Sequence, residues 1–262
     1  MNLGLAGKAV VVTGASKGIG LAVAQGLIRE GSRVAAGARE STADLTALAD
    51  EGDGAIVLGD LTTTAGCQAL IDEAVARFGG VDVLVNNVGG VRPRTGGFPS
   101  VTDEDWQWAL EMNLLSAVRA TRAAVPHLIA RAPSTIVTIC SVNASLPDPG
   151  VIDYSAAKAA LRSFCKSLSK ELGPRGVRVN TVSPGPVETA LWLGHGGVAE
   201  TVAQAQGTDP ATVRAAAVAG TPTGRFTRPA EVADLVLLLA AGTTGNITGT
   251  DVLIDGGMVT TL

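Results

Sequence analysis

Aromatic residues are scarce in this chain of 262 residues: they make up 3% of it, and Tyr154 is the single tyrosine. Hydrophobic residues nevertheless reach 46%, so a core must be built mainly from Ala, Val, Leu and Ile. A chain of this length can bury a substantial core, in one large domain or two small ones. Because no internal repeat and no Pro-rich linker divides the sequence, we expect a single domain over residues 1–262.

Cysteine and histidine are also few. Cys67, Cys140 and Cys165 are widely spaced, and His127 and His195 stand alone. Such spacing fits reduced thiols better than a disulfide framework or a zinc site. Neither HExxH nor CxxC occurs, so we expect no metal site.

Charged residues make up 17% of the chain, with a net charge of −4. Lys and Arg do not cluster, which argues against nucleic acid or an anionic membrane surface as partner. No apolar run reaches transmembrane length, and Met1–Lys8 lacks the basic region and apolar run of a signal peptide. We therefore expect a cytoplasmic protein, with no membrane partner, that acts on a small molecule.

Short apolar runs alternate with helical patterns along most of the chain. The predicted strands are 9–13, 33–38, 55–58, 81–85, 135–140, 177–182 and 251–254. The predicted helices are 21–29, 41–51, 63–78, 102–130 with a bend at Pro126, 154–172 and 229–241. This alternation predicts an α/β fold: a doubly wound parallel sheet in one domain. The remaining stretch, 188–220, is Gly-rich and weakly helical, and we expect it to be a lid over a site, with Leu191, Trp192 and Leu193 as its apolar contacts.

A glycine-rich turn follows the first predicted strand. It reads Gly14-Ala15-Ser16-Lys17-Gly18-Ile19-Gly20 and leads into a helix, which is the layout of a nucleotide site. Gly14 would allow a sharp turn, Gly18 a close approach of pyrophosphate, and Gly20 tight packing of helix on strand. The free N–H groups of the helix could then bind phosphate. A plain βα turn without a ligand remains the alternative, and the spacing GxxxGxG differs from the usual GxGxxG.

The end of the second predicted strand bears on which nucleotide would bind. A site for NAD commonly has an acidic residue there, but this chain has Ala38 followed by Arg39. Lys17 lies in the glycine turn on the same side. Two cations and no acid suit the 2′-phosphate of NADP better than NAD, although both could be surface residues and Glu40 could pair with either.

Polar residues follow several other predicted strands. Asp60-Leu61 comes after the third, Asn86-Asn87-Val88-Gly89 after the fourth and Ser141 after the fifth. Open α/β sheets bind ligands at these carboxyl ends. Asn113 interrupts the apolar face of helix 102–130; buried there, it would need partners, either as a structural bridge or as part of a site.

Tyr154 and Lys158 are four residues apart in a helical pattern, so they would project from the same face. The ammonium would favour the phenolate and lower the tyrosine pKa, which would allow proton exchange near neutral pH. Taken alone, such a pair is more often a core aromatic and a solvated lysine.

These motifs together resemble the short-chain dehydrogenase/reductase family. In order they are Gly14-x3-Gly18-x-Gly20, Asn86-Asn87-x-Gly89, Asn113, Ser141, Tyr154-x3-Lys158 and Pro184-Gly185. The resemblance extends from Leu5 to Gly257, with valine at 88 where the family usually has alanine. It implies a Rossmann-like sheet of about seven strands with helices on both faces, and hydride transfer between a nicotinamide cofactor and a ketone or secondary alcohol.

The resemblance also implies a role for each matching residue. Tyr154 would be the acid/base, Lys158 would lower its pKa and bind the nicotinamide ribose, and Ser141 would hold the carbonyl oxygen. Asn113 would anchor a water that links Lys158 to solvent. The implied cofactor contacts are Gly14, Ser16, Gly18, Ile19 and Gly20 at the pyrophosphate, Asp60, Leu61, Asn87 and Gly89 at the adenosine, and Pro184, Gly185 and Thr189 at the nicotinamide.

Three further residues are open to two interpretations. Asn143 could touch substrate, but we favour a role in bracing its loop. Arg92 and Arg94, in the loop 91–100, could attract an anionic substrate, but solvent-facing arginines are commoner.

The resemblance also implies a homotetramer that pairs through helices 103–130 and 153–172.

Two other classes of function remain open. The chain could be a related enzyme that acts on a C=C bond, or a dehydratase or epimerase. It could instead be a nucleotide-sensing protein that kept the fold without catalysis. Relatives of that second kind usually lack the tyrosine or the lysine, and both are present here.

Overall fold

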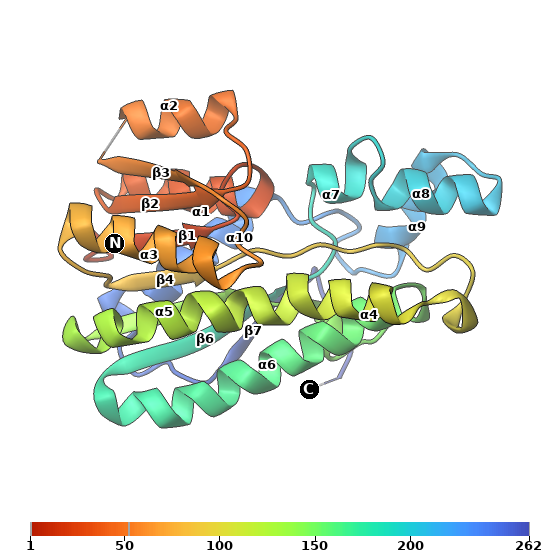
Figure 1. The fold of residues 1–262 in the computed structure, drawn as a ribbon. Helices are drawn as coiled ribbons and strands as arrows, with labels where there is room; N and C mark the ends of the chain where they lie inside the picture. Colours follow the sequence, from red (N-terminus) through yellow and green to blue (C-terminus); the bar gives the residue numbers. More distant parts are fainter. Residues whose placement is uncertain (1, 52, 262) are drawn as a thin grey trace.

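Seven parallel strands form one sheet at the centre of the molecule (Figure 1). The computed structural model describes residues 2–51 and 53–261. Its strands are β1 (Ala9–Thr13), β2 (Arg33–Ala38), β3 (Gly54–Leu58), β4 (Val83–Asn86), β5 (Ser134–Ile139), β6 (Val177–Pro184) and β7 (Asp251–Ile254). They lie in the order β3-β2-β1-β4-β5-β6-β7, which confirms the predicted doubly wound sheet.

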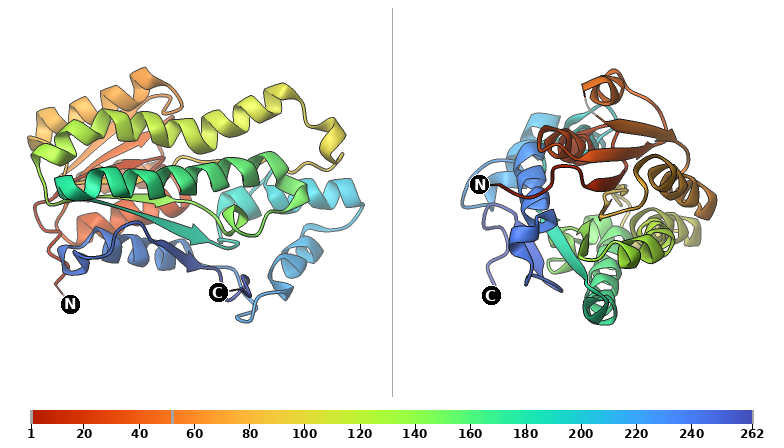
Figure 2. Two further views of the ribbon diagram at one scale, coloured as in Figure 1. Left: turned by 90° about the horizontal axis from the view of Figure 1, so that it is seen from below. Right: turned by 90° about the vertical axis from the view of Figure 1, so that its left-hand side faces the viewer.

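Helices cover both faces of this sheet (Figure 2). One face packs against α1 (Gly18–Arg29), α2 (Ala43–Glu51) and α10 (Pro229–Ala240). The other packs against α3 (Thr64–Phe78), α5 (Ser116–Ala130) and α6 (Ile152–Leu172). Each predicted helix except 102–130 is therefore present with ends within a few residues of those expected.

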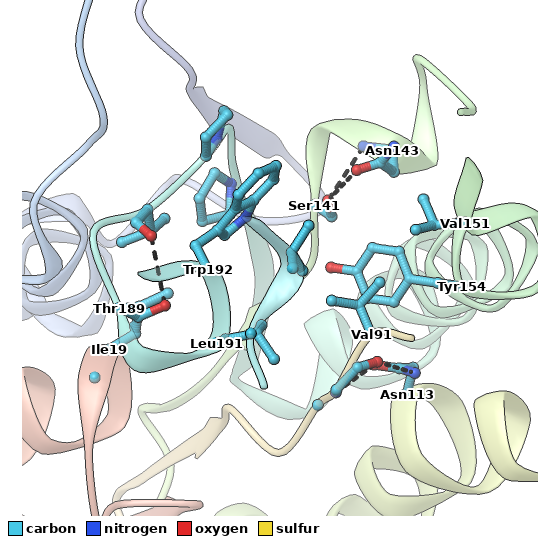
Figure 3. A pocket seen from close by; sticks show the side chains of 18 of the residues that line it. Ile19, Val91, Asn113, Ser141, Asn143, Val151, Tyr154, Thr189, Leu191 and Trp192 are labelled. Carbon is cyan, nitrogen blue, oxygen red and sulfur yellow. Dashed lines mark hydrogen bonds between the residues drawn. The ribbon is translucent and has the colours of Figure 1, made fainter. Parts of the chain in front are cut away.

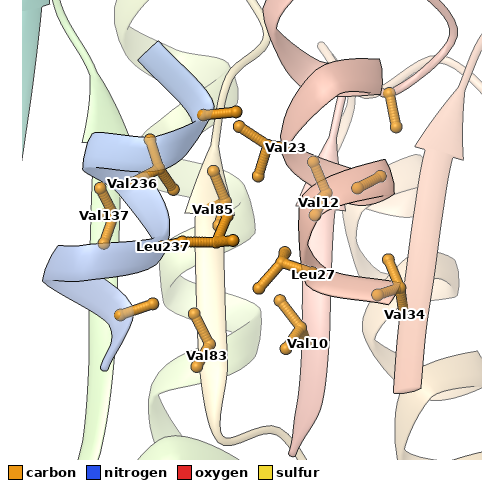
Figure 4. Close-up of a cluster of buried hydrophobic side chains, with 14 of the residues drawn as sticks. Val10, Val12, Val23, Leu27, Val34, Val83, Val85, Val137, Val236 and Leu237 are labelled. Carbon is orange, nitrogen blue, oxygen red and sulfur yellow. The ribbon is translucent and has the colours of Figure 1, made fainter. Parts of the chain in front are cut away.

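The core consists of small aliphatic side chains, as the shortage of aromatics requires. Figure 4 shows valines of the central strands packed against Val23 and Leu27 of α1 and Val236 and Leu237 of α10. Strand β1 is buried at all five positions, which explains its unbroken apolar run in place of an alternating pattern. Cys67, Cys140 and Cys165 are free thiols and are buried.

One predicted helix differs in the structure. Residues 102–130 were expected to form a single helix bent at Pro126, but α4 (Asp103–Leu110) passes into α5 through a π-helical turn over Glu111–Leu115. Pro126 lies inside α5 and does not end it. The irregularity is centred on Asn113 instead. The side-chain amide of Asn113 donates a hydrogen bond to the carbonyl of Ala109. Single-turn π-bulges of this kind are frequent at functional sites.

The Gly-rich stretch 188–220 contains three short helices. They are α7 (Ala190–Leu193), α8 (Val198–Gln206) and α9 (Pro210–Ala219), and they lie beyond the carboxyl ends of the strands (Figure 1). Within the described residues, no helix combines the length and the apolar character that crossing a membrane would require.

The chain reverses its direction of winding between β1 and β4. From β1 it proceeds outward to β2 and β3, and from β4 outward to β7 on the other side. A crevice opens at such a switch point, at the carboxyl ends of the strands. The glycine turn after β1 and the segment Asn87–Gly89 after β4 both lie there.

Candidate active site

One cavity of about 1100 Å³ contains nearly all of the predicted site residues (Figure 3). Its lining includes Gly14, Ser16, Lys17, Gly18, Ile19, Arg39, Asp60, Leu61, Asn87, Gly89, Asn113, Ser141, Tyr154, Lys158, Pro184, Gly185 and Thr189. Gly20 is not part of the lining. Residues from eight separate segments thus meet at one edge of the sheet.

The glycine turn has the backbone that its sequence predicts. Gly14 and Gly18 have φ of 69° and 59°, in the left-handed region that glycine adopts at little cost. Lys17, at the N-cap of α1, makes no side-chain cap hydrogen bond, so no capping side chain occupies the first N–H groups of α1. The turn therefore offers a cradle for a phosphate group at a helix N-terminus.

Gly20 has a packing function. A Cβ atom at this position would lie 2.3 Å from the carbonyl oxygen of Gly14 and 2.4 Å from Nδ2 of Asn87. That amide donates to the carbonyls of Thr13 (3.1 Å) and Gly14 (2.9 Å), which ties the end of β4 to the glycine turn. Only a glycine allows α1 to approach the turn so closely, while the expectation of a direct cofactor contact at Gly20 finds no support in the cavity lining.

Two cations lie where β2 ends. Ala38 is buried, whereas Arg39 and Lys17 are exposed and line the cavity. Among the described residues, neither cation forms an ion pair within 4.0 Å, so Glu40 does not engage Arg39. This end of the cavity is therefore suited to an anionic group.

Asp60 and Leu61 lie beyond β3 at the same end. Leu61 is buried, and the carboxylate of Asp60 accepts hydrogen bonds from the backbone N–H (2.9 Å) and the hydroxyl (2.7 Å) of Thr62. These bonds, with a smaller contribution from the charge of Arg39, hold the pKa of Asp60 below its usual value. Asp60 is therefore a carboxylate that fixes the turn after β3.

Asn113 connects the π-helical turn to the loop after β4. Its Oδ1 accepts from the backbone N–H of Gly90 (3.0 Å), and its Nδ2 donates to the carbonyls of Gly90 (2.9 Å) and Ala109 (3.1 Å). The side chain is fully buried and has partners for both amide atoms. A structural bridge is thus evident, and it holds Gly89 next to Lys158, whose Nζ lies 3.4 Å from where a Cβ of Gly89 would be.

Ser141 follows β5 and is buried beside Asn143. The Ser141 hydroxyl donates to Oδ1 of Asn143 (3.2 Å) and accepts from its backbone N–H (3.2 Å). Asn143 also donates to the carbonyl of Leu146 (3.3 Å). These bonds agree with the interpretation that Asn143 braces its loop, and they fix the position of the Ser141 oxygen.

Tyr154 and Lys158 project from the same face of α6, as their spacing predicts, but their pKa values shift in the opposite direction to that expected. Although part of the Tyr154 ring faces the cavity, burial raises the pKa of Tyr154 to about 12, and a hydrogen bond with Ser141 only partly offsets this. Burial also lowers the pKa of Lys158. The lysine Nζ lies 5.8 Å from the centre of the tyrosine ring and donates to the carbonyl of Ile139 (3.0 Å). The prediction of a lowered tyrosine pKa is wrong for this structure, because burial of the phenol disfavours the phenolate and is the dominant cause of the shift.

Arg94 is not the solvent-facing residue that the loop composition suggested, whereas Arg92 is exposed as expected. The Arg94 side chain is 9% exposed and forms ion pairs with Asp153, at the start of α6, and with Asp105 of α4 (2.8 Å). Its Nε lies 3.2 and 3.1 Å from the two oxygens of Asp153. Arg92 stacks over the ring of Trp108 at 3.9 Å. Neither arginine lines the cavity, so the cavity gains no positive charge from this loop.

Sequence reasoning missed most of the apolar lining of the cavity. These side chains come from loops and short helices without a chemical motif: Val91, Pro93, Val142, Leu146, Val151, Val198, Val202, Val213, Ala216, Ala217 and Met258. Leu191 and Trp192, which were expected as apolar contacts of the 188–220 stretch, do line the cavity. The missed residues carry no shared sequence motif, and they come together only when the chain has folded.

A glycine turn at the switch point of a parallel sheet, with Ser141, Tyr154 and Lys158 at the same edge, defines a Rossmann-type oxidoreductase. A family model described as Enoyl-(Acyl carrier protein) reductase matches residues 14–259. The chain is 33% identical over 260 residues to 3-oxoacyl-[acyl-carrier-protein] reductase FabG of Thermotoga maritima, which covers 97% of this chain and 99% of that one. It is 36% identical over 260 residues to 3beta-hydroxysteroid dehydrogenase 1 of Eggerthella lenta, covering 97% and 94%.

Among solved structures, L-sorbose reductase from Gluconobacter frateurii, in complex with NADPH and L-sorbose, superposes with a TM-score of 0.91. That match has 32% sequence identity and covers 100% of both chains. The chain belongs to the short-chain dehydrogenase/reductase family, as its motifs indicated. It is an enzyme of that family with a Rossmann-like fold.

Proposed function

We propose that this protein interconverts a ketone and a secondary alcohol with NADP(H) as hydride carrier. The observation that carries the proposal is the meeting of Ser141, Tyr154 and Lys158 in the same cavity as the glycine turn. A carbonyl oxygen between the Ser141 and Tyr154 hydroxyls would accept hydrogen bonds from both once the Ser141 hydroxyl turns from Oδ1 of Asn143. Figure 3 shows the Tyr154 hydroxyl directed into this space, with Ser141 nearby.

The residues at the glycine turn fit a dinucleotide. Gly14 and Gly18 give a backbone with room for pyrophosphate, and the N-terminus of α1 is free of a capping side chain. Ser16, Ile19, Asn87, Gly89, Pro184, Gly185 and Thr189 would complete the contacts, since all of them line the cavity. The bound nicotinamide supplies the hydride, whereas the protein orients the carbonyl and supplies the proton.

NADP(H) is preferred because the end of β2 lacks a carboxylate that would repel a phosphate. Arg39 offers a planar set of donors, and Lys17 a second positive charge, and neither is engaged in an ion pair within the described part of the chain. The NADPH named for the sorbose reductase structure supports the same choice.

Tyr154 acts as the proton donor in the direction of reduction. Since burial raises its pKa to about 12, the phenol keeps its proton at neutral pH and can deliver it from Oη to the carbonyl oxygen. Lys158, whose Nζ lies 5.8 Å from the centre of the ring, would stabilise the phenolate that forms when its ammonium is charged. Asn113 holds the loop at Gly90, and with it the backbone beside Lys158.

A second candidate is reduction of a C=C bond, which the description of the matching family model favours. The position of Ser141 beside Tyr154 argues for a carbonyl, because two hydroxyls converge where its oxygen would lie. A panel of simple ketones, secondary alcohols and enones, assayed by the absorbance of NADPH and NADH, separates the two. Turnover of enones at the C=C bond without turnover of ketones would exclude the leading proposal.

The variant Tyr154→Phe tests the chemistry. It removes one hydroxyl and should lower kcat by about 10²–10⁴ while NADPH binding stays near wild type. Activity within a few-fold of wild type would refute the role of Tyr154.

We further infer that residues 1–262 act as one catalytic domain and that the 188–220 segment is its substrate lid. A cytoplasmic homotetramer is also expected. Ala156 of α6 is exposed and Ala159 and Ala160 are half-buried, which would allow close helix contact, and Leu253 of the edge strand β7 is 40% exposed. Light scattering at micromolar concentration tests this, since a monomer would refute the tetramer.

A further inference from the structure

The cavity has two chemically different ends. Lys17, Arg39, Glu40 and Asp60 lie at the end formed by β1, β2 and β3. Beyond Ser141 and Tyr154, the lining is mainly aliphatic, and we call Val91, Leu146, Val151, Leu191, Trp192 and Val202 the apolar wall. Figure 3 shows Val91 and Val151 beside the Tyr154 ring and Leu191 on the side of the cavity where Thr189 and Trp192 lie.

The polar side chains in this part of the lining are Asn143, Asp148, His195, Gln206 and Thr212, and Gln206 is exposed. Asn143 is engaged with Ser141 and Leu146, and the hydroxyl of Thr212 donates to Asp209 (2.6 Å). Asp148 accepts from the backbone N–H of Gly150 (2.7 Å), and the side chain of His195 is 98% exposed at the rim. A substrate with many hydroxyls would therefore lose hydrogen bonds to water that the wall does not replace.

Cations are also lacking on this side of the cavity among the described residues, apart from Lys158 at the reaction centre. Arg94 is held by Asp105 and Asp153, and Arg92 stacks on Trp108 outside the lining. A carboxylate or phosphate next to the reacting carbonyl would find no partner here. The geometry thus disfavours anionic substrates as well as polyols.

Helix α9 leaves apolar surface uncovered at the same place. It has one charged residue, Arg214, and yet none of its ten residues is buried. Val213, Ala216 and Ala217 of α9 face the cavity. Leu146 and Leu191 of the apolar wall are 47% and 44% exposed. Exposed apolar surface that borders a reaction centre is expected to be covered by an apolar ligand.

We propose that the substrate is an uncharged ketone or secondary alcohol with a sizeable apolar group next to the reacting carbon, which the apolar wall and α9 bury. The proposal rests on the proposed ketone/alcohol activity and deepens it by naming the substrate class. The proposed substrate of this chain differs from the sugar named for the sorbose reductase structure, although the two folds are similar.

The test is a series of methyl n-alkyl ketones of increasing length, from butanone upward, with L-sorbose as the polyhydroxylated comparison. Burial of one methylene corresponds to about a fourfold gain, so kcat/KM should rise about fourfold for each added methylene until the wall is covered. L-Sorbose should be a poorer substrate than the longer ketones. A kcat/KM that does not rise with chain length, or a preference for L-sorbose, would overturn the proposal.

Two variants of α9 form a matched pair. Ala216 and Ala215 are adjacent exposed alanines, but Ala216 lines the active-site cavity while Ala215 lines a separate hollow near Arg225. Ala216→Asp should reduce the gain in kcat/KM per added methylene, whereas Ala215→Asp should keep both the wild-type gain and the wild-type turnover of butanone. Equal chain-length dependence in the two variants would contradict the assignment of α9 to the substrate.

Direct binding distinguishes failure of this proposal from failure of the proposed activity. Dissociation constants of the matching alkan-2-ols, measured by calorimetry with NADP present, should fall with chain length even if no turnover occurs. Chain-length-dependent binding without turnover would leave the substrate class standing and refute the activity. Turnover and binding that are both independent of chain length would refute the proposed substrate class and leave the proposed activity standing.

Discussion

The ion pair between Arg94 and Asp153 provides a sharp test of how the catalytic helix is held. Asp153 directly precedes Tyr154, is 1% exposed, and has two oxygens within hydrogen-bonding distance of Arg94. The backbone N–H of Arg94 also donates to the carbonyl of Gly150 (2.7 Å). The loop after β4 is thereby fixed to the N-terminus of α6 through both a side chain and the backbone.

Arg94→Met keeps most of the aliphatic stem and leaves Asp153 as a buried charge without its partner. Removal of one member of a buried ion pair costs about 3–5 kcal/mol of unfolding free energy. In a chain of this size each kcal/mol corresponds to roughly 2–4 °C, so the Tm should fall by about 6–20 °C. Urea denaturation and calorimetry measure both quantities.

A surface pair supplies the control for this prediction. Arg77 lies 3.8 Å from Asp53, and the two side chains are 48% and 55% exposed. Arg77→Met should therefore change the unfolding free energy by about 0–1 kcal/mol. The double variant Arg94→Met/Asp153→Leu removes both buried charges and should recover much of the lost stability. If Arg94→Met were as mild as Arg77→Met, the reasoning from burial would be refuted.

Three other predictions use single features of the site. Arg39→Ala removes a charge-assisted hydrogen bond of about 1.5–3 kcal/mol and should weaken NADPH binding by roughly one to two orders of magnitude. NADH binding should stay unchanged, and Arg29→Ala is the control variant. Equal loss for both cofactors would contradict the 2′-phosphate assignment. Because Tyr154 is the single tyrosine, phenolate absorbance should titrate near pH 12 in the folded protein and near 10 in denaturant. The unfolding free energy that the buried, protonated phenol contributes is then fully present below about pH 10 and is lost as the pH rises towards 12. Titration of the folded protein near pH 10 would show that burial does not control the pKa of Tyr154. Gly20→Ala should cost about 1–3 kcal/mol of unfolding free energy, since its Cβ would lie 2.3 Å from the Gly14 oxygen, whereas Gly220→Ala, with open space, should be nearly neutral.

The sheet and its helices were predictable from the sequence because each depends on local patterns. Strand β1 is an unbroken apolar run, and Thr102 caps α4 through a capping box with Asp105. Nearly all of the predicted site residues also meet in one cavity, because the ends of parallel strands share one edge.

The missed features depend on contacts between distant residues. Arg94 and Asp153 are 59 positions apart, and nothing in their spacing pairs them. The pKa of Tyr154 depends on how densely the whole site encloses the ring, so spacing to Lys158 gave the wrong direction. The π-helical turn likewise arises because Asn113 takes partners at Gly90, on another segment.

That turn gives the stretch from α4 to α5 a fixed length. A π-helical turn accommodates one residue more than an α-helical one, and each residue rotates a helix by about 100°. Deleting one residue of Glu111–Leu115 would turn the π-helical turn into an α-helical one and remove the bulge from which Asn113 reaches Gly90 and Ala109. A substitution along this stretch changes one side chain and leaves the π-helical turn in place, whereas an insertion or a deletion changes the turn itself. Engineering of this enzyme should therefore treat the number of residues between β4 and β5 as part of the active site.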